Sequence, residues 1–531
     1  MVKESSSAAN NSGPTVIHTL ILLSPSATMT DPFDVKYLAI NQLAYTFNKY
    51  TQLNTSNGVP QGLADVATQN LQLMKQYEVV HPIAETLLQF LTNQGISTED
   101  YTKEWITTTR SLNEAYLLQL DNDMKQILDQ AMEILSPERA VELFAKVRRA
   151  IVITLVQSKY EEGLILLTNY LSAVDFSTQP KTREKFVENR YMEFLFYQYV
   201  LNKFSMIWFP NDDHDGRKPS SVFNLGRSNK VAITSNSYKP LNQVYVKAST
   251  YHQKNESLFS PSDNETRYFW AIKFLHLKLL FKQFKFVEFY DEFSEYCLHQ
   301  KESIDILTDD LDILRSNLLV MFGIVSIFLK PFNSLALLGV GKDDILVDLF
   351  SENPDALEYK FYGEVMLPLA KCDFHRAKAS LLDPGFVTAL LANFEYNFPV
   401  SCRSTDGSAG PTFIEYLKLI IDLKNFFVIL TSSREISQSK VFQLLGYDET
   451  QSPDDIRDLA STFTGVIVAL DLAKYGIYYD SERGVFVNKP VADSANEIAA
   501  LQENIADLQN EVQAETLATK MTDLLVEKYY S

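Results

Sequence analysis

The sequence predicts a mainly α-helical protein, built as a long array of paired helices that ends in a small unit of two helices and a β-hairpin. Three observations lead to this prediction. Glycine and proline are scarce, at 18 and 19 of 531 residues. Apolar residues recur every three or four positions over long stretches, which is the spacing of one helix face. A polar turn followed by an aromatic residue also recurs between helical stretches.

The N-terminal part begins with a polar tail, residues 1–14, in which no apolar secretory segment is visible. We place N-terminal helical repeats over residues 15–208. The clearest periodicity lies in residues 112–135 and 141–156. The first stripe consists of Leu117, Leu120, Met124, Ile127, Ala131 and Ile134, and the second of Val141, Phe144, Val147, Ile151 and Leu155.

A weak repeat marks where a second helix should begin. Its three copies are Gln157–Leu167, Lys282–Phe293 and Lys371–Leu382. Each has a polar turn and then an aromatic residue, and the position three residues later is Gly163, Phe289 or Ala377. A small residue there lets two helices approach closely, so Phe289 should keep its pair further apart. Helix pairs of this kind form an α-solenoid of helical (TPR-like) repeats, although an irregular helical domain stays open.

Residues 209–267 differ from the array in composition. They contain DDHDGRKPSS, TSNSYKP and SPSDNE, with few periodic apolar residues, so we predict a polar surface insertion. Helical periodicity resumes over residues 268–433. This region contains the longest apolar run, Leu318–Leu329, which is too short to span a bilayer and predicts a buried helix.

Residues 434–490 follow a different pattern. Ser437–Leu445 predicts a short helix ended by Gly446, and Pro453 opens a second helix after Ser452 as N-cap. Strand-like residues 477–479 and 485–487 then flank a polar turn, which predicts a β-hairpin. Two helices followed by a hairpin are typical of a winged helix.

Residues 491–531 predict one long C-terminal helix. Its apolar positions repeat at intervals of three and four, as in a coiled-coil seam. They are Ile498, Leu501, Ile505, Leu508 and Val512. Such a stripe must be buried somewhere, either on the array of the same chain or, as we favour, against other subunits.

No residue pattern points to bond chemistry. Cys372 and His375 have a metal-like spacing without a second pair nearby, and Cys297 has no partnered histidine. Asp212–Asp215 lies in the predicted insertion, and no phosphate-binding loop is present. We therefore predict no catalytic, cofactor or metal site and no enzyme activity. The three cysteines fit a reducing compartment.

The charge argues against nucleic-acid binding. The chain carries a net charge of −19, and residues 434–490 contain six basic and nine acidic residues, which would repel phosphates. Protein association is the alternative use of the winged helix. We predict that Val485, Phe486 and Val487 form an exposed strand edge that pairs with a partner's strand; the same strand could instead only complete its own sheet.

A helical array followed directly by a winged helix resembles the PCI family. The resemblance spans Leu318–Val487 and lies nearest the signalosome subunit 1 and proteasome-lid types. The counterparts of the family's apolar motifs are Phe322-Gly323-Ile324-Val325, Val347-Asp348-Leu349-Phe350, Phe361-Tyr362 and Lys371-Cys372-Asp373-Phe374. Ser326 and Leu329 interrupt the small-residue run of the first motif, as in a divergent, fungal-type member.

The resemblance implies a non-catalytic scaffold subunit of a COP9 signalosome-like complex, which deneddylates cullins and so regulates cullin-RING ubiquitin ligases. The implied partners are other PCI subunits, a JAMM metalloprotease subunit and cullins, with no nucleic acid and no membrane. It also implies a cytoplasmic and nuclear location. The alternatives are a proteasome-lid or translation initiation factor three subunit, or a nucleic-acid-binding PCI protein of the mRNA-export type.

Overall fold

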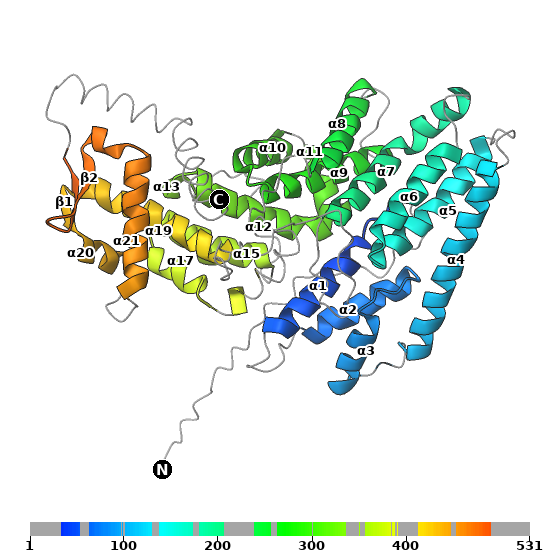
Figure 1. Ribbon diagram of the computed structural model, residues 1–531, viewed down its shortest axis with the longest axis horizontal. Helices are drawn as coiled ribbons and strands as arrows, with labels where there is room; N and C mark the ends of the chain where they lie inside the picture. Colours follow the sequence, from blue (N-terminus) through cyan, green and yellow to red (C-terminus); the bar gives the residue numbers. More distant parts are fainter. Residues whose placement is uncertain are drawn as a thin grey trace, which may run out of the picture. The chain divides into compact units, whose positions relative to one another are not determined.

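The protein is mostly helical, as predicted (Figure 1). The computed structural model describes residues 33–53, 63–96, 98, 101–129, 137–173, 180–206, 238–255, 263–299, 301–335, 350, 356–383, 385–387, 390, 413–447 and 453–489. The chain divides into two compact units. The first comprises residues 1–279, 299–318 and 388–398, and the second comprises residues 280–298, 319–387 and 399–531.

The first unit is a succession of helices in which neighbours in sequence pack together. Contacts join α1 to α2, α2 to α3, α4 to α5, α5 to α6, α6 to α7 and α7 to α8, which is consistent with a helical array. The elements are α1 (Leu38–Leu53), α2 (Leu63–Gln76), α3 (Ala84–Asn93), α4 (Lys103–Asp129), α5 (Pro137–Val156), α6 (Tyr160–Ala173), α7 (Pro180–Met206), α8 (Lys239–Lys254), α9 (Asn264–Lys282), α11 (Lys301–Asp305) and η4 (Ile306–Asp310).

The predicted helical stripes are buried in large part, although Leu117 and Ile127 of α4 are only half-buried. Leu120 and Met124 of α4 and Phe144, Val147 and Ile151 of α5 are in the core. Gly163 of α6 allows the predicted close approach. A Cβ atom there would lie 2.7 Å from Cδ2 of Leu201 and 2.8 Å from Oγ1 of Thr154.

Gly163→Ala is therefore expected to destabilise the protein by about 1–3 kcal/mol, because the added methyl group overpacks a filled site. Gly465→Ala is the matched control, since Gly465 is an exposed position in helix α21 (Pro453–Ala469) with nothing within 4 Å of a Cβ. The control should gain about 0.5–1 kcal/mol from helix propensity. Urea denaturation checks both; destabilisation by both substitutions would contradict the packing argument.

The three copies of the sequence repeat share one turn geometry. Ser158, Phe284 and Cys372 each adopt positive φ, near +60°. Two residues later, each following helix begins at its aromatic residue: α6 at Tyr160, α10 (Phe286–His299) at Phe286 and α17 (Phe374–Ser380) at Phe374.

The backbone hydrogen bonds also match among the three turns. In each turn, one N–H group donates a hydrogen bond to the carbonyl oxygen five residues earlier, as in a Schellman motif at the end of a helix. The donors are Lys159, Lys285 and Asp373. The recurrent sequence pattern therefore corresponds to a recurrent helix–turn–helix joint.

Cys372→Gly is expected to stabilise the protein by about 1 kcal/mol, because glycine adopts φ near +58° without a Cβ penalty. The Cys372 side chain is exposed, so little packing is lost. Cys372→Ala keeps the Cβ atom and should show no such gain. Equal thermal midpoints for the two variants would contradict the backbone explanation.

The second unit begins with further helices. They are α10, the later part of α12 (Asp312–Leu329), α13 (Phe332–Leu335), α15 (Leu357–Phe361), η6 (Tyr362–Met366), α16 (Leu367–Ala370), α17 and α19 (Phe413–Ser432). The run Leu318–Leu329 is buried throughout, as predicted. Gly323 of α12 packs against Phe361 and Met366, since a Cβ there would lie 2.8–2.9 Å from their side chains.

Residues 435–488 of this unit form what we call the sheet module. It consists of β1 (Glu435–Ser437), α20 (Gln438–Leu444), α21, η7 (Leu472–Tyr475), β2 (Ile477–Asp480) and β3 (Val485–Asn488). The strands are antiparallel in the order β1-β3-β2. The predicted hairpin is present, with Gly484 at φ +62° in its turn. Phe426 of α19 packs against Phe463 and Phe486 beneath the sheet.

The predicted insertion over residues 209–267 needs correction in part. Residues 239–254 form helix α8, whose Leu241, Val244 and Ala248 are buried in the first unit. Their spacing of three and four residues fits one helix face, and α9 begins at Asn264. Residues 209–237 lie outside the described part, as do the N-terminal tail and the predicted helix 491–531. No helix of the described part is long and apolar enough to cross a membrane.

Candidate functional site

The strand predicted to bind a partner is the centre of its own sheet. β3 pairs with β1 through Ile436↔Phe486 and with β2 through Tyr479↔Phe486. Phe486 and Val487 are each 1% exposed. Both sides of the backbone of Val485–Val487 are therefore occupied, and the prediction that this strand forms an exposed edge is wrong. The short strand β1 fills the second side.

The open edge of the sheet belongs to β2 instead. Among the described residues, only β3 pairs with β2. The N–H of Lys489 donates to the Gly476 carbonyl at 3.0 Å. Along an antiparallel strand, the N–H and C=O groups of alternate residues point toward the paired strand and away from it. Because Gly476 bonds to β3, the N–H and C=O groups of Ile477 and Tyr479 point away from β3. They are the groups that a further strand would bind.

Exposed apolar side chains lie on the elements around this edge. Val468, Tyr475 and Tyr478 are 73%, 48% and 40% exposed. They come from α21, η7 and β2, which contact one another. Tyr478 shares its face of the sheet with Val487 and Glu435, whereas α21 lies under the opposite face, on the side of Phe486. Exposed apolar side chains beside an open strand are typical of a protein-binding surface.

Charged groups cross the sheet on the module's surface. The carboxylate of Glu435 in β1 forms ion pairs with Lys489, with Nζ 2.7 Å from Oε1, and with Arg483, with Nη2 3.1 Å from Oε2. These hydrogen bonds, first from Lys489 and then from Arg483, lower the pKa of Glu435. All three groups are exposed, so the ion pairs contribute little stability.

A buried carboxylate fixes the sheet module to the helices before it. Asp422 of α19 accepts hydrogen bonds from Lys378 of α17 at 2.8 Å and from Tyr447, which follows α20. Lys378 also donates to the Leu445 carbonyl at 2.7 Å, at the end of α20. Burial raises the pKa of Asp422, and Lys378 opposes that shift. The module is thereby held rigidly on α17 and α19.

A buried lysine ties α19 to α12 in the same unit. Lys424 donates to the carbonyl oxygens of Ile327 and Lys330, at the C-terminal end of α12. A cation at this end of a helix satisfies free carbonyls and interacts favourably with the helix dipole. Burial lowers the pKa of Lys424 to about 7.

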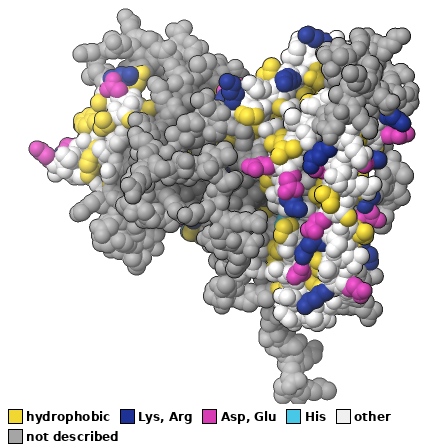
Figure 2. All heavy atoms as spheres, turned by 45° about the vertical axis from the view of Figure 1, so that its right-hand side comes forward, with side chains coloured by type: hydrophobic (Ala, Val, Ile, Leu, Met, Phe, Trp, Pro, Cys, Tyr) yellow, Lys and Arg dark blue, Asp and Glu magenta, His cyan; other side chains and the backbone are white. Residues whose placement is uncertain are grey.

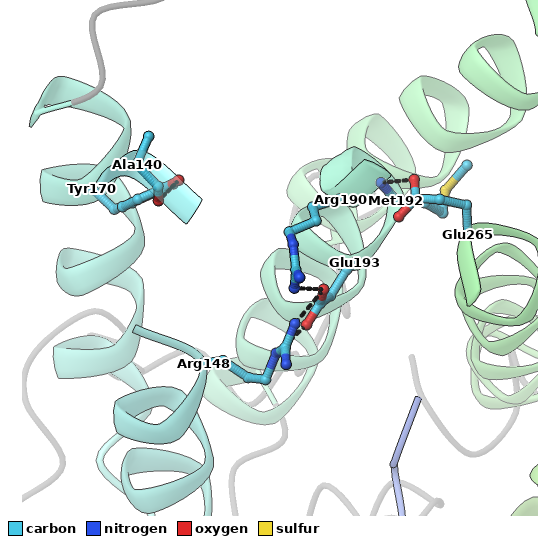
Figure 3. A network of polar contacts seen from close by, with 7 residues as sticks. All are labelled: Ala140, Arg148, Tyr170, Arg190, Met192, Glu193 and Glu265. Carbon is cyan, nitrogen blue, oxygen red and sulfur yellow. Dashed lines mark hydrogen bonds and ion pairs between the residues drawn. The ribbon is translucent and has the colours of Figure 1, made fainter. Parts of the chain in front are cut away.

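The first unit contains a buried polar network on α5, α7 and α9 (Figure 3). Arg148 of α5 forms a two-pronged pair with Glu193 of α7, with Nη2 donating to Oε2 at 2.9 Å and Nε to Oε1. Arg190 lies 3.6 Å from the same carboxylate. The Glu193 side chain is 4% exposed, and burial raises its pKa despite both arginines.

A second carboxyl group lies in the same network. Glu265, at the start of α9, accepts a hydrogen bond from the N–H of Met192 at 2.8 Å (Figure 3). Burial raises the pKa of Glu265 to about 8, and the charge of Glu193 adds to the shift. The network fixes α5, α7 and α9 relative to one another.

The surface around α4 and α5 carries both signs of charge. Figure 2 shows Lys and Arg side chains interspersed with Asp and Glu on this face. Arg110 pairs with Glu85 and Arg149 with Glu78. This face therefore has no continuous positive surface that would bind a phosphate backbone.

The cysteine positions considered in the sequence lie apart in structure. Cys297 is buried in α10, and burial raises the pKa of its thiol to about 12. Cys372 is exposed in the turn before α17, and His375 is near the start of that helix. Among the described residues, no three His, Cys, Asp or Glu side chains are grouped so that they could hold a metal ion. Asp212–Asp215 lies outside the described part.

The remaining predicted partner-binding residues cannot be located. Ile498, Leu501, Ile505, Leu508 and Val512 are in the segment that the structure does not describe. Sequence reasoning missed β1, the free β2 edge and the Glu193 network. The signal available for the β2 edge was the pair of tyrosines, Tyr475 and Tyr478, around the predicted first strand of the hairpin.

No protein-family model matches the chain, and no curated protein matches it.

Proposed function

We propose that the protein is a non-catalytic scaffold subunit of a PCI-type complex, with a COP9 signalosome-like assembly that deneddylates cullins as the first choice. The sheet module carries the proposal. Its order of helix, strand, two helices and two strands, from α19 to β3, is the order expected of a winged helix. It follows a helical region, as in the family that the sequence resembles.

The open β2 edge supports a role in assembly. A strand with free main-chain groups and neighbouring apolar side chains binds another strand by β-augmentation. The Asp422 contacts hold the module in place, so the edge is presented rigidly. The stripe Ile498–Val512 would supply a second contact, with helices of other subunits. Cytoplasmic and nuclear localisation is part of the same proposal.

Affinity purification of the tagged full-length chain, followed by mass spectrometry, tests which assembly it joins. Recovery of other PCI subunits with a JAMM metalloprotease subunit and cullins is the expected result. Recovery of proteasome-lid or translation initiation factor three components would instead assign the chain to that complex rather than to a signalosome-like assembly. Isolation of the chain without other PCI subunits would overturn the proposal.

Nucleic-acid binding of the mRNA-export type is the competing function. The net charge of −19 and the interspersed charges near α4 and α5 argue against it. In a gel-shift assay at 50 mM salt, we expect no RNA binding up to micromolar protein. A salt-sensitive shift below that concentration would favour the competing function.

A further inference from the structure

The outer face of the sheet, opposite the face on which Phe426 packs, carries two rows of side chains that end at β2. Side chains of every second residue along a strand share a face. One row is Glu435, Val487 and Tyr478, and the next is Ser437, Val485 and Asp480. Phe486 lies between the rows and points to the inner face, where it contacts Phe426. A strand added to β2 would place one side chain beside Tyr478 and another beside Asp480.

The carboxylate of Asp480, at the β2 end of its row, has one oxygen in use. The N–H groups of Glu482 and Arg483 both donate to Oδ1, at 3.1 and 3.2 Å. Among the described residues, no group donates to Oδ2 and no cation forms an ion pair with Asp480. The paired carboxylate of Glu435 lies at the other end of the face, on β1. The acceptor that remains at the edge is therefore Oδ2 of Asp480.

The charges around Asp480 favour a basic neighbour. Glu482, exposed in the hairpin turn, adds a second negative charge two residues further along. Arg483 interacts electrostatically with Asp480, but its guanidinium group donates to Glu435. Residues 434–490 as a whole contain six basic and nine acidic residues. A lysine or arginine beside Asp480 would be attracted, whereas an acidic side chain at the same position would be repelled.

The row of Tyr478 favours an apolar neighbour. Val487, beside it on β3, is 1% exposed, whereas Tyr478 at the end of the row is 40% exposed. An apolar side chain on an added strand would cover the exposed ring, and cross-strand contacts between aromatic and apolar side chains stabilise a sheet. The residues beside Tyr478 and Asp480 are two positions apart in the added strand, in whichever direction that strand runs.

We propose that the strand added to β2 carries a lysine or arginine beside Asp480 and an apolar residue, two positions away, beside Tyr478. The proposal rests on the proposed function, in which β2 binds a neighbouring subunit, and it names the chemistry of that subunit's strand. Main-chain hydrogen bonds to Ile477 and Tyr479 are available to any added strand. The two side-chain contacts on the outer face select among strands.

A photocrosslinking side chain on the outer face identifies the added strand directly. Benzoylphenylalanine in place of Tyr478 keeps an aromatic group at the end of the row, and the tagged full-length chain is irradiated in its purified assembly. We expect mass spectrometry to find a crosslinked segment of another subunit in which an apolar residue lies two positions from a lysine or arginine. A segment without that basic residue, a segment of the same chain, a second copy of the chain or no crosslinked protein would overturn the proposal.

Charge removal tests the contact with Asp480. Asp480→Asn keeps the oxygen that accepts from the turn and removes the charge, and Glu482→Gln removes one charge from the turn, outside both rows, as the matched control. At about 50 mM salt, recovery of the crosslinked subunit by the tagged full-length chain should fall about two- to fivefold with Asp480→Asn and stay at the parent level with Glu482→Gln. The deficit should disappear at about 500 mM salt, where the attraction is screened.

Equal recovery with Asp480→Asn and Glu482→Gln at low salt would contradict the charge contact while leaving the proposed function intact. Recovery of no PCI subunit by the parent chain would contradict the proposed function itself. The two failures are therefore distinguishable.

Discussion

Arg148→Met is expected to lower the free energy of unfolding by about 3–5 kcal/mol, since it leaves the buried carboxylate of Glu193 without its two-pronged partner. Arg190, at 3.6 Å, is too distant to replace those hydrogen bonds. Urea denaturation of the full-length chain measures the loss.

The neighbouring residue supplies the control for this prediction. Arg149 pairs with Glu78, and both side chains are exposed, so Arg149→Met should cost less than about 1 kcal/mol. Adding Glu193→Gln to Arg148→Met should recover much of the loss, because the unpaired charge is removed. Equal effects of Arg148→Met and Arg149→Met would show that the Glu193 network does not stabilise the first unit.

Glu265→Gln is expected to stabilise the protein at pH 8.5 by about 3–5 kcal/mol and to have little effect at pH 4.5. Burial raises the pKa of Glu265 to about 8 from its ordinary value of 4.5. Between these values the folded state binds more protons than the unfolded state. The stability contributed by this group is therefore complete below pH 4.5 and is lost as the pH rises to about 8.

The amide of glutamine keeps an oxygen that accepts from Met192 and does not ionise. The difference in stability between variant and parent isolates the contribution of Glu265 from that of other groups. Lys424 is one such group, and its lowered pKa makes stability rise with pH rather than fall. Glu162→Gln, at an exposed position of α6, is the charge-matched control and should follow the parent. Parallel stability–pH curves for Glu265→Gln and the parent would contradict a buried, protonated Glu265.

The sequence predicted the elements whose signals are local. The run at Leu318–Leu329 and most described residues of the apolar stripes of α4 and α5 lie in the core, because helix periodicity reports on burial. The aromatic at each repeat joint marks the first residue of a helix, as at Tyr160 and Phe286.

The errors arose where distant residues decide the structure. β1 is three residues long and exists because it pairs with β3, some fifty residues later; no local pattern reveals it, so Val485–Val487 looked like an edge. Helix α8 was obscured by polar residues around Leu241, Val244 and Ala248. The Glu193 network joins three helices, and only their packing brings Arg148, Arg190 and Glu265 together.

Partner recovery by an edge variant tests the central claim most directly, namely that the sheet module binds a neighbouring subunit through β2. Tyr478→Lys adds a charge to the open strand, whereas Leu444→Lys adds the same charge to another exposed apolar position of the module, on α20. Each variant is purified as a tagged full-length chain, and co-purifying subunits are quantified by mass spectrometry. Recovery of PCI subunits should fall at least about tenfold with Tyr478→Lys and stay at the parent level with Leu444→Lys; equal recovery with both variants would contradict the claim.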